Sequence, residues 1–174
     1  MQIDRTEETR LGPEDEAAIA SLLADSFGTD FGGRSFFMQR HHVRLVARDP
    51  GIVGHMALCL RAIRLGDSLV DIIGLAEVAT APDRRGEGIA SRLMSTAIAE
   101  ARQTCAEFFV LFGDQPLYAA SGFIPQRNVL RYVDMEGGRT GAVHMGRKGG
   151  LMVLPLGTKR WDPEAELDML GAVF

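Results

Sequence analysis

The chain has 174 residues, of which 46% are hydrophobic and 24% are charged. These values are typical of a soluble globular protein and unlike those of disordered or membrane chains, so we expect one domain over residues 1–174. The net charge of −4 disfavours a general nucleic-acid or anionic-membrane binder, because phosphate groups bind surfaces rich in Lys and Arg. The polar first ten residues lack the apolar stretch of a signal peptide, which predicts a cytoplasmic protein.

A helix over residues 13–27 is the first predicted element, because apolar residues recur there at helical spacing. Residues 29–40 mix Gly, Phe and polar residues without a period, which predicts a loop or short helix that could lie over a site. Three strands are predicted next, over 43–48, 52–64 and 68–80, because residues that favour tight turns separate them. We therefore expect an antiparallel meander.

A charged, glycine-rich loop at 83–88 follows, and a helix is predicted over 89–105. The rest of the chain predicts a strand over 107–112, a short helix over 115–121 and a strand over 129–134. A basic, glycine-rich stretch without apolar period follows over 137–150, then a last strand over 151–156 and a partly helical tail over 161–174. Cys59 and Cys105 fall in the predicted strand and helix, as two buried free thiols. Neither has a partner at metal-ligand spacing, so no metal site is predicted.

The loop at 83–88 joins a strand to a helix, so its backbone N–H groups lie at a helix N-terminus, where the macrodipole favours anions. Gly86 and Gly88 lack a Cβ and let a ligand approach the backbone, while Arg84 and Arg85 add positive charge. A pyrophosphate fits both features. A Gly-x-Gly at a helix start is by itself more often an ordinary turn, so the surrounding sequence has to decide.

Two segments together resemble the GNAT acetyltransferase superfamily. Residues 85–90, Arg-Gly-Glu-Gly-Ile-Ala, match its (Q/R)-x-x-G-x-(G/A) signature, and residues 78–83 resemble its lead-in strand. In residues 117–123, Tyr118 stands five positions before the phenylalanine of a Gly-Phe pair, as in the family's second signature. The resemblance implies an α/β (α+β) fold with a mixed, largely antiparallel twisted sheet of about six to seven strands flanked by helices. The P-loop and dinucleotide patterns match less well, because the Gly-Lys-Ser/Thr ending and the third glycine are missing.

The resemblance also implies the activity: an acyltransferase that moves an acetyl or other acyl group from acyl-CoA to a primary amine of a small molecule, by direct attack in a ternary complex. It places the pantetheine arm against the backbone of one strand end, at Val78, Ala79 and Thr80. It places the pyrophosphate on a run of loop and helix residues, Arg85, Gly86, Glu87, Gly88, Ile89, Ala90 and Ser91. Asp114 stands near where many relatives carry an asparagine that contacts the cofactor, so this sequence departs from the family at that position.

Two residues are candidates for proton transfer. Tyr118 falls where such enzymes place the acid that protonates the departing thiolate, a role that suits a phenol with an ordinary pKa of about 10. Glu77 is the candidate base, because a carboxylate inside an apolar strand costs free energy unless it is hydrogen-bonded or functional. Relatives with a glutamate one position earlier would point it at the opposite face of the strand. The other candidate bases, which could equally be surface groups, are His41, His42, His55 and His144.

The acceptor is the least defined part of the prediction. The aromatic N-terminal loop, the Leu-Tyr-Ala stretch and residues 152–156 resemble the aminoglycoside 2′-N-acetyltransferase and nodulation acyltransferase branch. Four tail carboxylates would favour a cationic amine if they border the cleft, although a solvated helix face explains them as well: Asp162, Glu164, Glu166 and Asp168. An aminoglycoside or amino sugar is thus one candidate, and a homodimer is left open. The rival functions are a non-catalytic CoA-binding sensor or interaction module and an ATP-binding protein.

Overall fold

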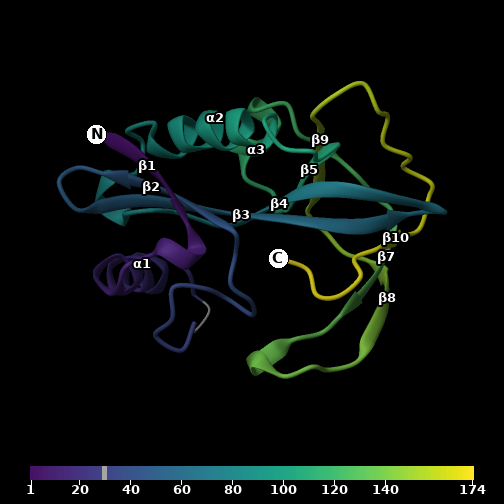
Figure 1. The fold of residues 1–174 in the computed structure, drawn as a ribbon, viewed down its shortest axis with the longest axis horizontal. Helices are drawn as coiled ribbons and strands as arrows, with labels where there is room; N and C mark the ends of the chain where they lie inside the picture. Colours follow the sequence, from purple (N-terminus) through teal and green to yellow (C-terminus); the bar gives the residue numbers. More distant parts are fainter. Residues whose placement is uncertain (29–30) are drawn as a thin grey trace. The chain divides into compact units, whose positions relative to one another are not determined.

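The computed structural model describes residues 1–28 and 31–174 (Figure 1). Residues 29–30, the first two of the predicted loop over 29–40, lie outside the described residues. The chain divides into two compact units, the first formed by Met1–Cys59 and Ala76–Ala99 and the second by Leu60–Leu75 and Glu100–Phe174. In the described part, no helix is long and apolar enough to cross a membrane.

The first unit contains two helices and the strands that they cover. Its elements are β1 (Gln2–Glu7), η1 (Glu8–Arg10), α1 (Pro13–Ser26), β2 (Val43–Arg48), the first part of β3 (Ile52–Leu65), the last part of β4 (Ser68–Thr80), η2 (Pro82–Arg84) and most of α2 (Ile89–Ala101). Strand β2 pairs antiparallel with both β1 and β3. Helix α1 starts with Pro13, whose fixed φ suits a first helical position, and carries three acidic residues in its first turn.

Helices α1 and α2 cover opposite faces of the strands in this unit (Figure 1). Helix α1 buries Ile19 and Leu23 in a cluster with Val46 of β2 and Ala79 of β4. On the other face, α2 approaches β3 so closely that a Cβ at Gly54 would lie 2.7 Å from a side-chain carbon of Ile89. A glycine at this position therefore fixes how tightly the start of α2 packs on the sheet.

The second unit contains the rest of β3 and β4 and most of the remaining strands. The new elements are β5 (Phe108–Phe112), α3 (Pro116–Ala120), β6 (Ile124–Pro125), β7 (Val129–Val133), η3 (Glu136–Gly138), β8 (Val143–Arg147), β9 (Leu151–Pro155) and β10 (Leu167–Asp168). Strand β5 runs parallel to β4 and antiparallel to β9, which also pairs with β6. Strand β10 pairs with β3 and β7, and β7 pairs with β8. The core of this unit is a cluster of buried apolar side chains that includes Ile72, Phe108, Val110, Leu130, Val153 and Leu167.

The prediction of six to seven strands is wrong, because the described chain contains ten. All six strands that the sequence predicted individually are present, and β1, β6, β8 and β10 are additional. The added strands are short or polar, so backbone pairing with a neighbour rather than an apolar pattern defines them. Strand β1, for example, pairs with β2 over its whole length, and an ion pair of 2.7 Å between Asp4 and Arg48 adds to this pairing.

Two helix predictions also need correction. Helix α2 ends at Ala101 and not at residue 105, because the Thr104 hydroxyl donates to the Ala101 carbonyl and accepts the N–H of Ala106, which closes the helix end. Cys105 is consequently exposed in the following turn, whereas Cys59 is buried as predicted. The tail over 161–174 contains β10 and no helix, since Leu167 is buried by pairing with two strands.

Candidate functional site

The glycine-rich loop has an open backbone at the start of α2. Gly86 and Gly88 have φ angles of 85° and 76°, which side chains with a Cβ rarely adopt. Nothing lies within 4 Å of the place that a Cβ would occupy at either glycine. The helical ladder starts with the Arg92 N–H, which donates to the Gly88 carbonyl, so the preceding amides lie outside it. The predicted pyrophosphate-binding stretch therefore combines space, free N–H groups and the positive end of a helix dipole.

The two arginines of this loop differ in their surroundings. Arg84 donates to both oxygens of Glu87, at 2.8 and 3.0 Å, and to the Asp49 carboxylate at 2.9 Å. The hydrogen bonds from Arg84 hold the pKa of Glu87 below its usual range. Arg85 is exposed and has no ion pair within the described residues. Arg85, rather than Arg84, is the cation that remains available for a phosphate.

Glu77 interrupts β4 at the place where the sequence predicted a base. Its φ angle is 52°, in the left-handed region that non-glycine residues rarely occupy inside a strand. The simple alternation of side chains is broken at this residue, so the face that Glu77 occupies could not be read from the sequence. The predicted pantetheine-binding residues, Val78, Ala79 and Thr80, follow directly as the last three residues of β4.

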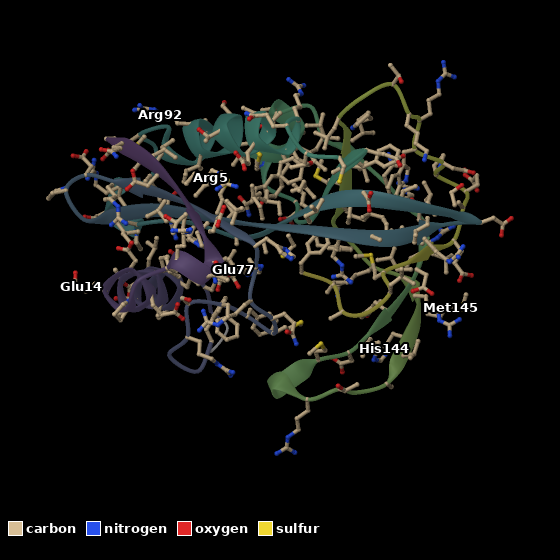
Figure 2. The ribbon with its side chains drawn as sticks, in the orientation of Figure 1. Arg5, Glu14, Glu77, Arg92, His144 and Met145 are labelled. Carbon is tan, nitrogen blue, oxygen red and sulfur yellow. The ribbon has the colours of Figure 1, made fainter. Side chains whose placement is uncertain are left out.

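The carboxylate of Glu77 is buried and has three partners among the described residues; Figure 2 labels its position. Its side chain is 5% exposed. Oε1 accepts the backbone N–H of Phe37 at 2.5 Å and lies 2.9 Å from Nε2 of His41, while Oε2 accepts from Arg44 at 3.0 Å. Glu77 helps to raise the pKa of His41 to about 9, so the ring is charged at neutral pH and this contact is an ion pair. These donors offset the cost of burying the negative charge.

Arg44 links Glu77 to a second carboxylate. Its side chain is 0% exposed and donates to Glu8 at 2.6 and 3.1 Å. The same guanidinium donates to the Ser35 carbonyl at 2.8 Å and lies 3.1 Å from Nε2 of His55. Burial works to raise the pKa of Glu8, but the hydrogen bonds and charge of Arg44 outweigh it and lower that pKa. Arg44 is thus the central cation of a buried charged cluster.

At neutral pH one of the two histidines of this cluster is charged and the other is neutral. Burial works to lower the pKa of His41, but the contacts with Cys59 and Glu77 outweigh it and raise that pKa to about 9. Burial and the charge of Arg44 lower the pKa of His55 to about 4, so this ring is neutral. Nδ1 of His55 lies 2.9 Å from the Glu77 carbonyl oxygen and must donate to it, which leaves Nε2 to accept from Arg44. The cluster therefore holds two negative groups, Glu8 and Glu77, and two positive groups, Arg44 and His41.

The structure shows which of the four candidate histidines lie near Glu77. His41 and His55 contact Glu77, whereas His42 is exposed and His144 stacks on Tyr132 in the second unit. Figure 2 shows His144 and its neighbour Met145 on β8. The central role of Arg44 was not predicted from the sequence. An arginine inside the apolar strand over 43–48 gives the same signal as Glu77 and could have revealed it.

Tyr118 lies in α3 of the second unit and is 7% exposed. Its ring packs edge-on against Phe123 and over Gly113, where a Cβ would lie 2.6 Å from a ring carbon. Burial, with a smaller effect of the negative charge of Asp114, raises the pKa of Tyr118 above its ordinary value. The phenol is therefore protonated at neutral pH, the state that a general acid requires.

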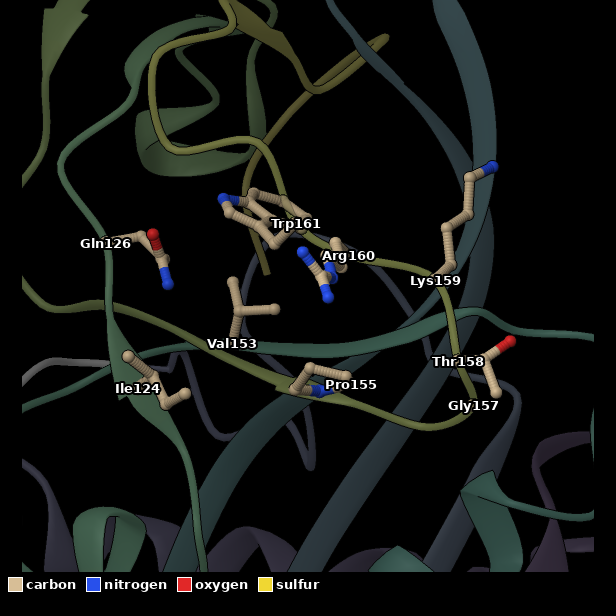
Figure 3. A pocket seen from close by; sticks show the side chains of 9 residues that line it. All are labelled: Ile124, Gln126, Val153, Pro155, Gly157, Thr158, Lys159, Arg160 and Trp161. Carbon is tan, nitrogen blue, oxygen red and sulfur yellow. The ribbon is translucent and has the colours of Figure 1, made fainter.

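A cavity of about 410 Å³ lies elsewhere in the second unit (Figure 3). Its walls include Trp161, Val153 and Ile124, and Lys159 at its rim pairs with Glu107. None of the residues that the sequence predicted for the site lines this cavity. Within the described residues, no group of three or more His, Cys, Asp or Glu side chains is placed to hold a metal ion.

The sequence and the fold of this chain are similar to those of known acetyltransferases. The model of the Acetyltransferase (GNAT) domain family matches residues 9–124, two thirds of the chain, so this chain belongs to the GNAT acetyltransferase family. The predicted family is thereby confirmed. No curated protein matches the chain.

Solved structures share the fold at low sequence identity. A GNAT family acetyltransferase from Brucella melitensis, in complex with acetyl-CoA, is 21% identical with a TM-score of 0.62, covering 95% of this chain and 94% of that one. The N-acetyltransferase YhbS from Escherichia coli, in complex with CoA, is 20% identical with a TM-score of 0.67, covering 96% and 88%. The ribosomal-protein-S18-alanine N-acetyltransferase from Escherichia coli is 16% identical with a TM-score of 0.60, covering 91% and 97%. These similarities confirm the GNAT fold, with a mixed sheet and flanking helices.

Proposed function

We propose that this chain is a single-domain N-acyltransferase that moves an acetyl or other acyl group from acyl-CoA to a primary amine. Membership of the GNAT family supports acyl transfer. The observation that carries the proposal is the open glycine loop at the start of α2, where Gly86 and Gly88 have positive φ and Arg85 is an unpaired cation among the described residues. This arrangement suits a pyrophosphate, which needs several N–H donors and a positive charge.

The donor would bind along the end of β4 and the start of α2. Backbone groups of Val78, Ala79 and Thr80 would pair with the pantetheine arm, and the amides of residues 85–91 would hold the pyrophosphate. Two structures with the same fold were solved with acetyl-CoA or CoA bound, which supports this donor. The charge of the loop supports it too, because Arg84 is already neutralised by Glu87 and Asp49 whereas Arg85 is not.

Glu77 is the proposed base, acting directly or through a water molecule. A carboxylate has about four acceptor positions. Oε1 of Glu77 contacts the Phe37 N–H and His41, while Oε2 accepts from Arg44, so one position on Oε2 is left to take a proton. The surrounding cations fix the carboxylate in place and balance its charge. The amine would then attack the thioester directly in a ternary complex.

Tyr118 is the proposed acid that protonates the thiolate of CoA. Its buried, protonated phenol supports this role. Replacing Tyr118 with phenylalanine removes only the hydroxyl and keeps the ring that packs on Gly113 and Phe123. The variant should bind acetyl-CoA like the wild type and lose turnover, whereas a non-catalytic CoA sensor would show no acetyl transfer with either protein.

The acceptor is proposed only as a class. A small-molecule amine such as an aminoglycoside or amino sugar is favoured by the sequence resemblance, while the similar Escherichia coli enzyme is named for a protein N-terminal alanine. A panel of aminoglycosides, polyamines and peptides with a free N-terminal alanine, assayed by release of CoA thiol, separates these classes. Transfer to peptides alone would exclude the small-molecule proposal. Absence of thiol release with every amine, from protein that binds acetyl-CoA, would favour the sensor.

A further inference from the structure

Cys59 has no part in the proposed reaction, yet it contacts the buried charged cluster formed by Glu8, Arg44, Glu77, His41 and His55. Its Sγ lies 2.9 Å from Nδ1 of His41, and Nε2 of the same ring lies 2.9 Å from Oε1 of Glu77. A thiol, an imidazole and a carboxylate therefore stand in sequence, with the ring between the other two. This is the arrangement of an activated nucleophile: a base within hydrogen-bond reach of the nucleophile, itself oriented by a third group.

The ring of His41 places a positive charge next to the sulfur of Cys59. The imidazole is protonated at neutral pH, because Cys59 and Glu77 raise the pKa of His41 to about 9 against the effect of burial. The other groups in the cluster are Arg44, which is paired with Glu8 and Glu77, and His55, which is neutral. A cation next to a sulfur stabilises the thiolate, which is the nucleophilic form of cysteine.

Cys59 is also placed beside the proposed donor strand. It lies on β3, which is the neighbour of β4 in the sheet. His55, four residues earlier on the same face of β3, reaches the Glu77 carbonyl at 2.9 Å. The sulfur and the Glu77 carboxylate are thus on one face of adjacent strands, and Val78 to Thr80 continue from Glu77. Cys59 as a residue is 8% exposed, so bulk reagents reach its sulfur less readily than that of the exposed Cys105.

The second cysteine provides an internal comparison. Cys105 is exposed in the turn after α2, and its thiol has no polar partner among the described residues. Accessibility alone would make Cys105 the more reactive thiol. Activation by His41 would make Cys59 the more reactive one. The two explanations therefore predict opposite sites of modification in the same molecule.

We propose that Cys59 is an acylation site, on which the protein carries an acyl group taken from its own bound acyl-CoA when no amine is present. The inference rests on the proposed function, since it needs the acyl donor. The Cys59 thiolate attacks the thioester carbonyl, a new carbon–sulfur bond forms, and the bond from the carbonyl carbon to the CoA sulfur breaks. The proton that left Cys59 is held by His41 and passes to the CoA thiolate, so one thioester replaces another without any oxidant, reductant or further reactant.

The test is to incubate the full chain with acetyl-CoA without amine, quench it in acid, and map acetylated peptides by mass spectrometry. Wild type and Cys105→Ser should carry acetyl on the peptide with Cys59, and neutral hydroxylamine should release it, as it does a thioester. Cys59→Ser should carry no such label. His41→Gln should acylate about 100-fold more slowly, the usual contribution of a general acid, because it has no proton to give to the departing CoA thiolate; its acetyl-CoA affinity is measured separately.

The outcomes separate this inference from the proposed function. Acetylation of an amine by wild type with no label on Cys59 would overturn the inference and leave the function standing. Equal labelling of Cys105, or equal rates in His41→Gln and wild type, would also overturn it, because the reaction would then be unassisted. Absence of acetyl-CoA binding by folded protein would defeat the function and the inference together, and circular dichroism of each variant confirms that it is folded.

Discussion

Replacing Arg44 with methionine tests whether the buried charged cluster is held together by one cation. Arg44 is 0% exposed and is the shared partner of the Glu8 and Glu77 carboxylates, at 2.6 and 3.0 Å. Methionine fills similar space but leaves both carboxylates without this donor. Removing one partner of a buried ion pair costs about 3–5 kcal/mol, so we expect the free energy of unfolding to fall by that amount.

The matched control is Arg40→Met. Arg40 also pairs with Glu8, and with Glu16, each at 2.9 Å, but its side chain is 51% exposed. Exposed pairs contribute below about 1 kcal/mol, so this variant should lose little. Urea unfolding followed by circular dichroism gives both values at pH 7. Equal losses in the two variants, or a loss below about 1 kcal/mol for Arg44→Met, would refute the reasoning.

The same experiment has a predicted pH dependence. Since Arg44 lowers the pKa of Glu8, the pairing stabilises the native state above the ordinary carboxyl value of 4.5 and is lost as the pH falls through the lowered pKa. The difference in stability between wild type and Arg44→Met should therefore shrink below about pH 4. A difference that stays constant from pH 7 to pH 3 would show that packing, not charge, explains the loss.

Three further predictions concern single groups. His41, whose pKa is raised from 6.5 to about 9, stabilises the fold fully below pH 6.5 and loses up to about 3 kcal/mol as the pH rises through 9, a slope in urea unfolding that His41→Gln should lack. Gly88→Ala forces a Cβ onto a φ of 76°, so it should cost about 1 kcal/mol and weaken acetyl-CoA binding about tenfold by titration. The control is Gly149→Ala, where φ is not in the left-handed range and a Cβ has space, so unchanged binding is expected. Tyr118→Phe should keep the acetyl-CoA Kd and lower kcat about 100-fold at saturating amine, and an unchanged kcat would exclude the phenol as the acid.

Much of the fold follows from local sequence signals. The strands over 43–48, 52–65 and 68–80 were predicted almost to the residue, because Pro50-Gly51 and Gly66-Asp67 interrupt long apolar runs. Strands β1 and β10 were missed because their pairing partners are distant in the sequence and their own residues carry little pattern. Strand β8 pairs with the preceding strand β7, and it was missed because it lies in the glycine-rich stretch over 137–150, which has no apolar period. A two-residue strand such as β10 is defined by the ladder alone.

The candidate site shows the same division between local and non-local information. Glu77 was conspicuous because it stands in an apolar strand, and its neighbours Val78 to Thr80 and the glycine loop are contiguous with it. Its positive φ and its partners were not predictable, since His41, Arg44 and Phe37 come from segments more than thirty residues away. The contact between His41 and Cys59 likewise depends on the pairing of β2 with β3, which places the two segments side by side.

Isothermal titration of the folded protein with acetyl-CoA, and separately with ATP, tests whether the glycine loop is an acyl-CoA site. The account predicts micromolar binding of acetyl-CoA and much weaker binding of ATP, because ATP offers phosphates to the loop but has no pantetheine arm for the end of β4. Tight ATP binding would contradict the assignment of that strand end. No heat with acetyl-CoA or with longer acyl-CoA donors would contradict the acyltransferase proposal itself.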